Sequence, residues 1–500
     1  MTQGAGHPDD PLIDHTAYEL QRALSDAIER YVGELRTAQF RALTYRGADL
    51  GRAIALNLYF RLVNDPALRA AHARAAAGEN LGHDPDAVPV STEAYWVLRQ
   101  MLNRRLPLTR ARLKEHVKRS WTMGVSHLEI GATPVRQKDG KVLILALSRR
   151  FFDYLMPVRR ALGADAAWLV PANAAWAEEA GAQGERIVPF DTMADAEPEG
   201  PLTQPVAAYW RELALRFDTF RRILAMESPD AVLMTEGNQP DDEILARAAA
   251  GLGIRSICIQ QGWSPIVHSG FRDMRYDAFC VWGREFARLL QPENPRQYFA
   301  VTGSHRIEPT PAAWPAKERA IGFFLQNNSL LITSRAWREM LDFVRWTAAT
   351  WPEREILVRE HPATPLTEEE QSLLAGLPNL KLCPASTVSL DAMLRRTGVA
   401  VAFYSTTLLE ALAYDATPLI INITGAHHYL PDLAAMGAAI EVKDFHAARA
   451  AMHRLRDGAT LRNNPALLHG FFACPSYQAL RNIVATALPA IARQHTTGLE

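Results

Sequence analysis

Residues 399–422 read VAVAFYSTTLLEALAYDATPLIIN, and the pattern of this stretch decides the fold class. Its two ends, 399–404 and 418–422, are short apolar runs, as expected of strands that are buried on both faces of a parallel sheet. Residues 406–415 between them have the composition and apolar spacing of a helix. A strand, a helix and a second strand in this order predict an α/β unit with parallel strands.

The same alternation extends towards the N-terminus. Three more strands are expected before this stretch, at residues 321–326, 355–360 and 380–384. An earlier series begins with KVLILALS at residue 141, and helical segments separate its members. Its other predicted strands lie at residues 166–171, 186–190, 231–236, 256–261 and 277–283. The sequence therefore predicts two Rossmann-like α/β domains in succession.

Changes in composition along the chain predict the domain boundaries. A chain of 500 residues is too long for one hydrophobic core, so several domains are expected. We expect a helical N-terminal region, a first Rossmann-like domain for the acceptor side, a Pro-rich linker, a second Rossmann-like domain for the donor side, and C-terminal helices. Their predicted ranges are 1–135, 136–306, 307–319, 320–443 and 444–500.

Composition and charge exclude several classes of protein. Hydrophobic residues make up 48% of the chain and charged residues 22%, and the formal net charge is −1. No field of the whole molecule therefore favours nucleic acid or anionic lipid. The four cysteines form no CxxC pair, the first residues are polar, and no apolar run is long enough to span a bilayer. We expect a cytoplasmic protein without a transmembrane segment, with the inner face of the membrane as an alternative location.

Two motifs follow strands of the second predicted domain. His361 comes directly after one strand, and its imidazole can donate a hydrogen bond to a phosphate oxygen. Ser405, Thr406 and Thr407 follow another strand at the start of a helix, where hydroxyls and backbone amides can bind phosphate. Loop or helix capping alone would also explain these residues. Because the carboxyl ends of parallel strands meet at one edge, the two motifs predict a ligand site.

Other polar residues are expected at the same edge. Gln326 and Asn327 end the first strand of this domain, and their amides can reach the phosphates or the base of a nucleotide; ordinary turn formation is the alternative. Arg359, which precedes His361 closely, and Arg335 on the first helix can pair with a carboxylate of a ligand.

One carboxylate is the main catalytic candidate of the first predicted domain. Glu236 ends an apolar strand, and Gly237 lets the backbone turn closely beside it. A carboxylate in such a place can act as a general base if burial tunes its pKa. Asp241 and Asp242 are alternatives, although acids at the start of a helix also have a simple structural role.

The overall layout resembles that of GT-B glycosyltransferases, over roughly residues 140–490. The motifs at His361, Ser405–Thr406 and Glu236–Gly237 resemble those of bacterial transferases that use CMP-activated sialic acid or Kdo. The layout is also similar to capsule-polysaccharide and CDP-glycerol transferases. The resemblance implies that His361 contacts the nucleotide and stabilises the leaving phosphate, and that the Ser/Thr pair holds the donor phosphate.

The resemblance has one further implication and two departures. It implies that Glu410 accepts hydrogen bonds from ribose hydroxyls; a surface glutamate is the alternative reading. Only one acid precedes Gly237 in the acidic-Gly motif. Capsule and glycerophosphate transferases often have Gln-His-Gly where this chain has Gln260-Gln261-Gly262, so Gln261 stands in place of the histidine. His268, seven residues further on, can substitute for it; a solvated loop histidine is the alternative.

The predicted function is transfer of a CMP-activated acidic sugar to a glycan, lipid-linked or protein acceptor in bacterial surface glycoconjugate synthesis. The chain has no GxGxxG after a strand, no P-loop and no metal-ligand spacing, so we expect no cofactor, no metal and no nucleic-acid partner. The alternatives are a CDP-alditol or UDP/GDP-sugar transferase, an enzyme similar to UDP-sugar 2-epimerases, and a non-catalytic carbohydrate-assembly protein.

Overall fold

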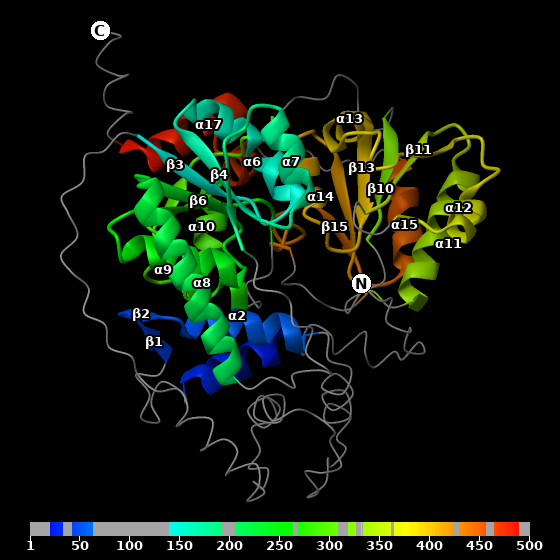
Figure 1. Ribbon diagram of the computed structural model, residues 1–500. Coiled ribbons are helices and arrows are strands. Elements are labelled where there is room, and N and C mark those ends of the chain that lie inside the picture. The colour runs from blue at the N-terminus through cyan, green and yellow to red at the C-terminus, as the bar shows by residue number, and fades with distance from the viewer. Residues whose placement is uncertain are drawn as a thin grey trace, which may run out of the picture. The chain divides into compact units, whose positions relative to one another are not determined.

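The computed structural model describes residues 21–33, 43–63, 140–191, 206–263, 269–308, 319–326, 332, 334–361, 365–423, 430–456 and 465–489. These residues divide into two compact units (Figure 1). The first unit contains the described residues within 20–262, 266–306 and 476–500, and the second contains those within 307–475 together with Trp263. Each unit is built on one parallel sheet, which confirms the predicted class of two Rossmann-like α/β domains.

The first unit has a seven-stranded sheet. Its spatial order is β5 (Ile187–Phe190), β4 (Ala166–Pro171), β3 (Val142–Leu145), β6 (Ala231–Thr235), β7 (Arg255–Ile259), β8 (Ala278–Val281) and β9 (Phe299–Val301). The order reverses between β3 and β6, and such a reversal is where α/β sheets bind ligands. Its helices are α6 (Arg149–Leu162), α7 (Ala175–Ala182), α8 (Val206–Glu227), α9 (Pro240–Ala250) and α10 (Arg284–Leu290).

The second unit has a six-stranded sheet. Its spatial order is β12 (Leu380–Leu382), β11 (Ile356–Arg359), β10 (Ala320–Phe324), β13 (Thr397–Ala402), β14 (Thr417–Ile421) and β15 (Ile440–Val442). The order reverses between β10 and β13. Its helices are α11 (Ser334–Thr350), α12 (Glu368–Leu374), α13 (Leu390–Arg396), α14 (Thr407–Leu412), α15 (Phe445–Arg456) and α16 (Pro465–Phe471). The sequence analysis did not expect β15, which is only three residues long at the edge of the sheet.

The C-terminal helices divide between the units, although they form one group in the predicted organisation. Phe445 and Met452 of α15 belong to the core of the second unit. By contrast, α17 (Ser476–Ala487) packs against α6 of the first unit, where Ile483 is buried in the core (Figure 1). An apolar helix face shows that a helix is packed, but it does not show against which sheet.

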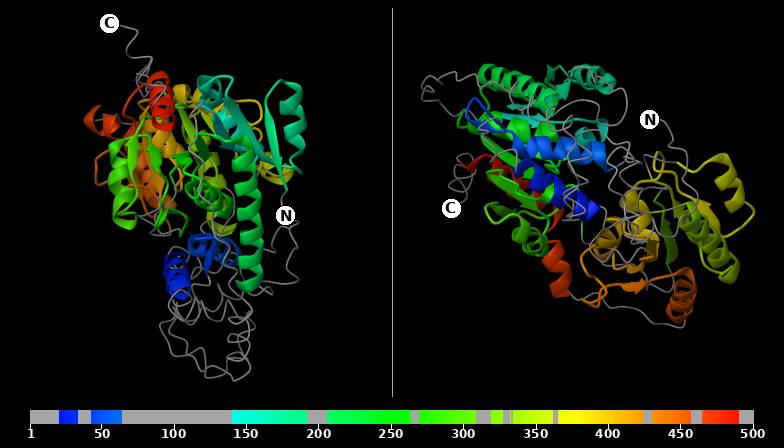
Figure 2. Two further views of the ribbon diagram at one scale, coloured as in Figure 1. Left: turned by 60° about the vertical axis from the view of Figure 1, so that its left-hand side comes forward. Right: turned by 90° about the horizontal axis from the view of Figure 1, so that it is seen from below.

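The described part of the N-terminal region belongs to the first unit. Residues 21–33 are helical, and α2 (Gly51–Leu62) packs against α8 and α9 (Figures 1 and 2). In the sequence, a small hairpin of β1 (Thr44–Tyr45) and β2 (Ala48–Asp49) separates these two helical segments, in a region that was predicted to be helical. Arg46 and Gly47 form its turn with φ of 47° and 81°, as the twist of a two-residue hairpin requires. Of the predicted helical region 1–135, residues 1–20, 34–42 and 64–135 lie outside the described residues.

Two further observations concern burial and hydropathy. Cys258 and Cys280 are buried free thiols. Among the helices of the described ranges, none combines the length and the apolar character that crossing a bilayer requires.

Candidate functional site

The chain makes a tight, left-handed turn at the carboxyl end of β6. Glu236 and Gly237 have φ of 61° and 68°. The amide of Glu236 donates to the carbonyl of Ile259 (3.0 Å), and the amide of Gly237 donates to the carbonyl of Thr235 (2.7 Å). A Cβ on residue 237 would lie 2.7 Å from Cε2 of Tyr276 and 2.9 Å from Sγ of Cys258. Only glycine therefore fits at the second position of the turn.

The surroundings of Glu236 change the proton affinity of its side chain. Its side chain is partly buried, and burial raises the pKa of the carboxyl group above its usual value. The charge of Arg150 and a hydrogen bond from Nδ2 of Asn238 to Oε2 (3.2 Å) oppose this shift. The result is a carboxyl group at the end of the strand with a raised proton affinity.

The two alternative acids are engaged in structural contacts. Asp241 accepts a hydrogen bond from Nη1 of Arg216 on α8 (2.5 Å). Asp242 is 2% exposed, and its Oδ2 accepts from the amide of Gln239 at the start of α9 (3.1 Å). Burial raises the pKa of Asp242 well above its usual value. Asp241 is therefore held by a cation and Asp242 by burial, whereas Glu236 accepts a hydrogen bond from the neutral amide of Asn238.

The adjacent glutamines at the end of β7 differ in their hydrogen bonding. Gln260 is fully engaged: its Oε1 accepts from the amide of Trp282 (2.9 Å), and its Nε2 donates to the carbonyl of Gly262 (3.1 Å). Gln261 is also buried, at 9% exposure, but its Oε1 accepts no hydrogen bond from the residues that the structure describes. Because a buried amide oxygen without a donor is unfavourable, a polar group of a ligand or water is expected there.

In the second unit, two of the predicted loops meet. Oε1 of Gln326, just after β10, accepts a hydrogen bond from the backbone amide of Tyr404, just after β13 (3.1 Å). Because β10 and β13 are neighbours at the reversal of the strand order, this bond joins the loops at the ligand-binding edge expected of the sheet.

The hydroxyls of the Ser405–Thr407 turn have protein partners. Oγ of Ser405 accepts from the amide of Thr407 (3.2 Å), at the first residue of α14. Oγ1 of Thr406 donates to the carbonyl of Trp263 (3.1 Å) and accepts from its amide (3.2 Å), within the second unit. Ser405 therefore supports the start of α14, whereas Thr406, which precedes the helix, makes no side-chain capping bond to it. A phosphate would have to share these groups.

The charged candidates of the second unit lie in different surroundings. Arg359 ends β11, is partly buried, and its Nη1 donates to the carbonyl of Val388. Burial lowers the pKa of Arg359, and the charges of Glu360 and Glu410 partly offset this. Glu410 is partly buried on α14 and not a freely exposed surface residue. His361 is partly buried after β11, whereas Arg335 is 51% exposed and pairs with Glu339 (3.8 Å).

Some predicted site residues cannot be placed. Asn327 and His268 lie outside the described residues. Within the described ranges, no group of three or more His, Cys, Asp or Glu side chains is arranged to hold a metal ion.

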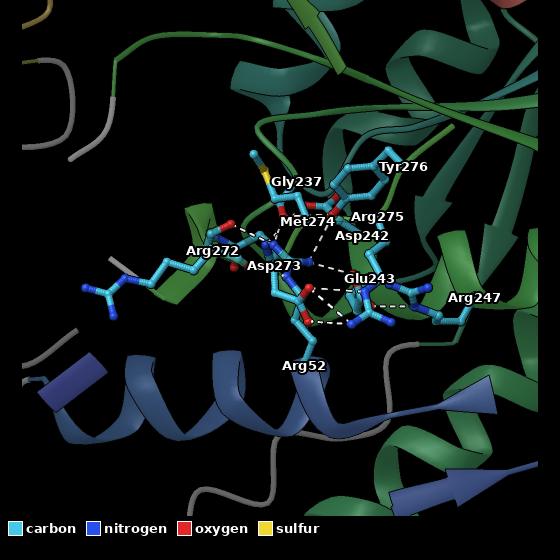
Figure 3. Close-up of polar contacts among 12 residues, drawn as sticks. Arg52, Gly237, Asp242, Glu243, Arg247, Arg272, Asp273, Met274, Arg275 and Tyr276 are labelled. Atoms are coloured by element: carbon cyan, nitrogen blue, oxygen red, sulfur yellow. Dashed lines mark hydrogen bonds and ion pairs between the residues drawn. The ribbon is translucent and has the colours of Figure 1, made fainter. Parts of the chain in front are cut away.

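Sequence reasoning missed Arg52, which lies beneath the Glu236–Gly237 turn (Figure 3). Arg52 is 7% exposed, and its Nη1 lies 2.5 Å from Oε2 of Glu243 in a buried ion pair. Burial opposes ionisation of Glu243, but the charges of Arg52 and Arg247 outweigh it and lower the pKa of the carboxyl group. Nothing in the local pattern of α2 distinguishes Arg52 from a surface arginine, because its partners lie far away in the sequence.

Comparison with known proteins gives matches to solved structures only. No protein-family model matches the chain, and no curated protein sequence matches it. The chain is similar to the glycotransferase of kitacinnamycin (14% identity, 71% of this chain and 98% of that one, TM-score 0.46). It is also similar to the spinosyn forosaminyltransferase SpnP (16% identity, 72% of this chain and 99% of that one, TM-score 0.44). A third similar structure is the UDP-GlcNAc 2-epimerase of Methanocaldococcus jannaschii (14% identity, 72% of this chain and 100% of that one, TM-score 0.47).

Proposed function

We propose that this chain is a metal-independent glycosyltransferase of the GT-B class. The second unit binds a nucleotide-sugar, and the first unit binds an acceptor and supplies the general base, Glu236. The observation that carries the proposal is the contrast among three neighbouring acids. Asp241 is paired with Arg216 and Asp242 is a buried cap, whereas Glu236 is partly exposed on a turn that sterically requires glycine beside it.

The proposed reaction uses these residues in a defined order. The carboxylate of Glu236 takes the proton of an acceptor hydroxyl as that oxygen attacks the anomeric carbon of the donor. The bond between this carbon and the phosphate oxygen breaks, and the nucleotide leaves with the bonding electrons. His361 and the amides of the Ser405–Thr407 turn stabilise the charge on the leaving phosphate. Oε1 of Gln261, to which no side chain or amide of the described ranges donates, would accept a hydrogen bond from the acceptor.

The donor in this proposal is a CMP-activated acidic sugar of the sialic acid or Kdo type. Its support is the resemblance of the His361 and Ser405–Thr406 motifs to transferases of that kind. Arg359 is the candidate partner for the sugar carboxylate, because it is partly buried at the end of β11. Its hydrogen bond to Val388 leaves the other nitrogens of the guanidinium for such a contact. The acceptor is a glycan, a lipid-linked sugar or a protein.

A thermal-shift screen against CMP, CDP, UDP and GDP, each with and without EDTA, tests the proposal. We expect CMP to give the largest rise in Tm and EDTA to leave it unchanged. Release of CMP from CMP-sialic acid or CMP-Kdo then measures turnover. A larger shift with UDP would replace the donor, and formation of free sugar from UDP-GlcNAc without an acceptor would identify an epimerase. If none of the four nucleotides raised Tm, the chain would not be a nucleotide-sugar enzyme.

A further inference from the structure

We propose that Arg52, in the N-terminal segment, is a positioning residue that fixes the Glu236–Gly237 turn and thereby aims the Glu236 carboxylate. This inference rests on the proposed role of Glu236 as the general base. It assigns a catalytic purpose to α2, which precedes the first strand of the α/β sheet and has no place in the sheet itself.

Every N–H of the Arg52 guanidinium is used. A guanidinium has five N–H donors in a planar fork. Arg52 makes five hydrogen bonds: to the carbonyls of Arg272 (3.0 Å), Gly237 (3.2 Å) and Gly270 (2.7 Å), to Oε2 of Glu243 (2.5 Å) and to the hydroxyl of Tyr276 (3.4 Å). Figure 3 shows the side chain reaching from α2 into this set of acceptors. These five hydrogen bonds fix the orientation of the Arg52 guanidinium group.

The turn that Arg52 contacts needs external support. A residue other than glycine is strained in the left-handed region, and Glu236 has a φ of 61°. The carbonyl of Gly237 is held from outside the turn by two donors, the hydroxyl of Tyr276 (2.8 Å) and Nη2 of Arg52 (3.2 Å). Loss of either donor leaves a buried carbonyl under-satisfied, so the turn can relax and move the preceding carboxylate.

The surroundings of residue 52 require both a positive charge and the planar shape of a guanidinium group. Glu243 neutralises the buried charge, and Arg247 binds the other oxygen of Glu243 from within α9 (2.6 Å). The fork of the guanidinium reaches acceptors on the turn, the helix and the 270–276 loop at once. The single ammonium of lysine has only three donors and cannot span them. A lysine would keep the charge next to Glu243 but lose contacts to the turn.

Amide hydrogen exchange tests the structural half of the proposal without any substrate. The variants are Arg52→Lys and the milder Tyr276→Phe, and the matched control is Arg247→Lys. The Arg247→Lys change alters the other arginine that pairs with Glu243. Among the described contacts, Arg247 has none with the Glu236–Gly237 turn. We expect faster exchange in the peptide that covers 235–239 for both test variants and unchanged exchange there for the control. Unchanged exchange in both test variants would overturn the assignment of Arg52.

A double-mutant cycle tests the catalytic half, with release of CMP from CMP-sialic acid as the readout. We expect Arg52→Lys to lower kcat by about 10- to 100-fold, as misplacement of a catalytic group does, with KM for the donor nearly unchanged. In a Glu236→Gln background the same change should lower kcat by less than about 3-fold, because the residue it positions has gone. Equal losses in both backgrounds would overturn the positioning role.

The two ways to fail are distinguishable. If Glu236→Gln alone kept the normal rate, the proposed base would be wrong and the catalytic half of this inference with it. If Glu236→Gln lost activity while Arg52→Lys kept both the rate and the exchange pattern of the natural chain, the proposed function would stand and only the role of Arg52 would fall.

Discussion

The side-chain oxygen of Gln326 accepts a hydrogen bond from the backbone amide of Tyr404, 3.1 Å away. The bond connects the loops after two neighbouring strands, at the point where the strand order of the second unit reverses. The residues that follow Gln326 and Tyr404 in the sequence, Asn327 and Ser405, belong to motifs that were predicted to bind the donor. A ligand at this edge of the sheet would meet both loops together.

Replacing His361 by alanine should weaken binding of the donor nucleotide. Loss of one charge-assisted hydrogen bond to phosphate is worth about 1.5–3 kcal/mol, so Kd should rise about 10- to 100-fold. Isothermal titration with CMP measures it. Arg335→Ala is the control, since Arg335 is exposed and pairs only weakly with Glu339 at 3.8 Å. Equal Kd values for the His361→Ala variant and the natural chain would remove His361 from the donor site.

Glu236→Gln should lower turnover by about 10²- to 10⁴-fold, the usual contribution of a positioned base. Binding of CMP and the free energy of unfolding should change little, because glutamine keeps the shape of the side chain. In contrast, Asp241→Asn should mainly reduce stability, because it weakens the contact with Arg216 (2.5 Å). Initial rates and urea unfolding of both variants provide the comparison. Loss of rate in the Asp241→Asn variant alone would place the base on α9.

Asp242 should make stability fall as pH rises. Burial raises the pKa of Asp242 well above its usual value of 3.8, so the folded state holds the proton more tightly than the unfolded chain does. The stabilising contribution is therefore fully present below pH 3.8 and is lost as pH rises through the raised pKa. Asp242→Asn cannot lose this proton. Its free energy of unfolding should exceed that of the natural chain increasingly across this window, as urea titrations at several pH values would show; parallel curves would contradict the prediction.

Gly237→Ala should be more destabilising than Gly253→Ala, although both glycines have a φ of 68°. A Cβ at 253 meets nothing within 4 Å, so only backbone strain of about 1–2 kcal/mol is expected. At 237 the Cβ also collides with Tyr276 and Cys258, which should add about 1–3 kcal/mol of overpacking. Chemical unfolding measures both losses. Equal losses would mean that the Tyr276 ring moves aside without cost.

Alanine substitutions of the neighbouring Gln260 and Gln261 should have different effects, the first on stability and the second on binding of the acceptor. Gln260→Ala removes the acceptor of the Trp282 amide and should reduce the free energy of unfolding by about 1–3 kcal/mol. Gln261→Ala removes an oxygen to which none of the described residues donates, so it should leave stability unchanged or improved. If that oxygen meets the acceptor, KM for the acceptor should rise. A destabilised Gln261→Ala variant with a normal KM would show that Gln261 is structural.

Local patterns in the sequence were enough to predict the α/β class and the positions of most strands. Runs such as 231–235 and 399–402 are recognisable because a strand buried on both faces must be apolar throughout. The residues that follow these runs are known from the sequence as well, so Glu236, Gln261 and Ser405 could be proposed before any contact was seen. The edge at which they lie follows from the parallel arrangement of the strands.

Which of these candidates is available for chemistry depends on contacts between distant parts of the chain. Asp241, Asp242 and Glu236 are alike in sequence, and only their partners separate a paired, a capping and a partly exposed carboxylate. No local sequence pattern predicts that α17 packs in the first unit. Nor does any local pattern predict that Arg52 binds Gly237, which is 185 residues away. The spacing of apolar residues in the sequence indicates which side chains are buried. The hydrogen-bond partners of a side chain are determined only when folding brings distant donors and acceptors together.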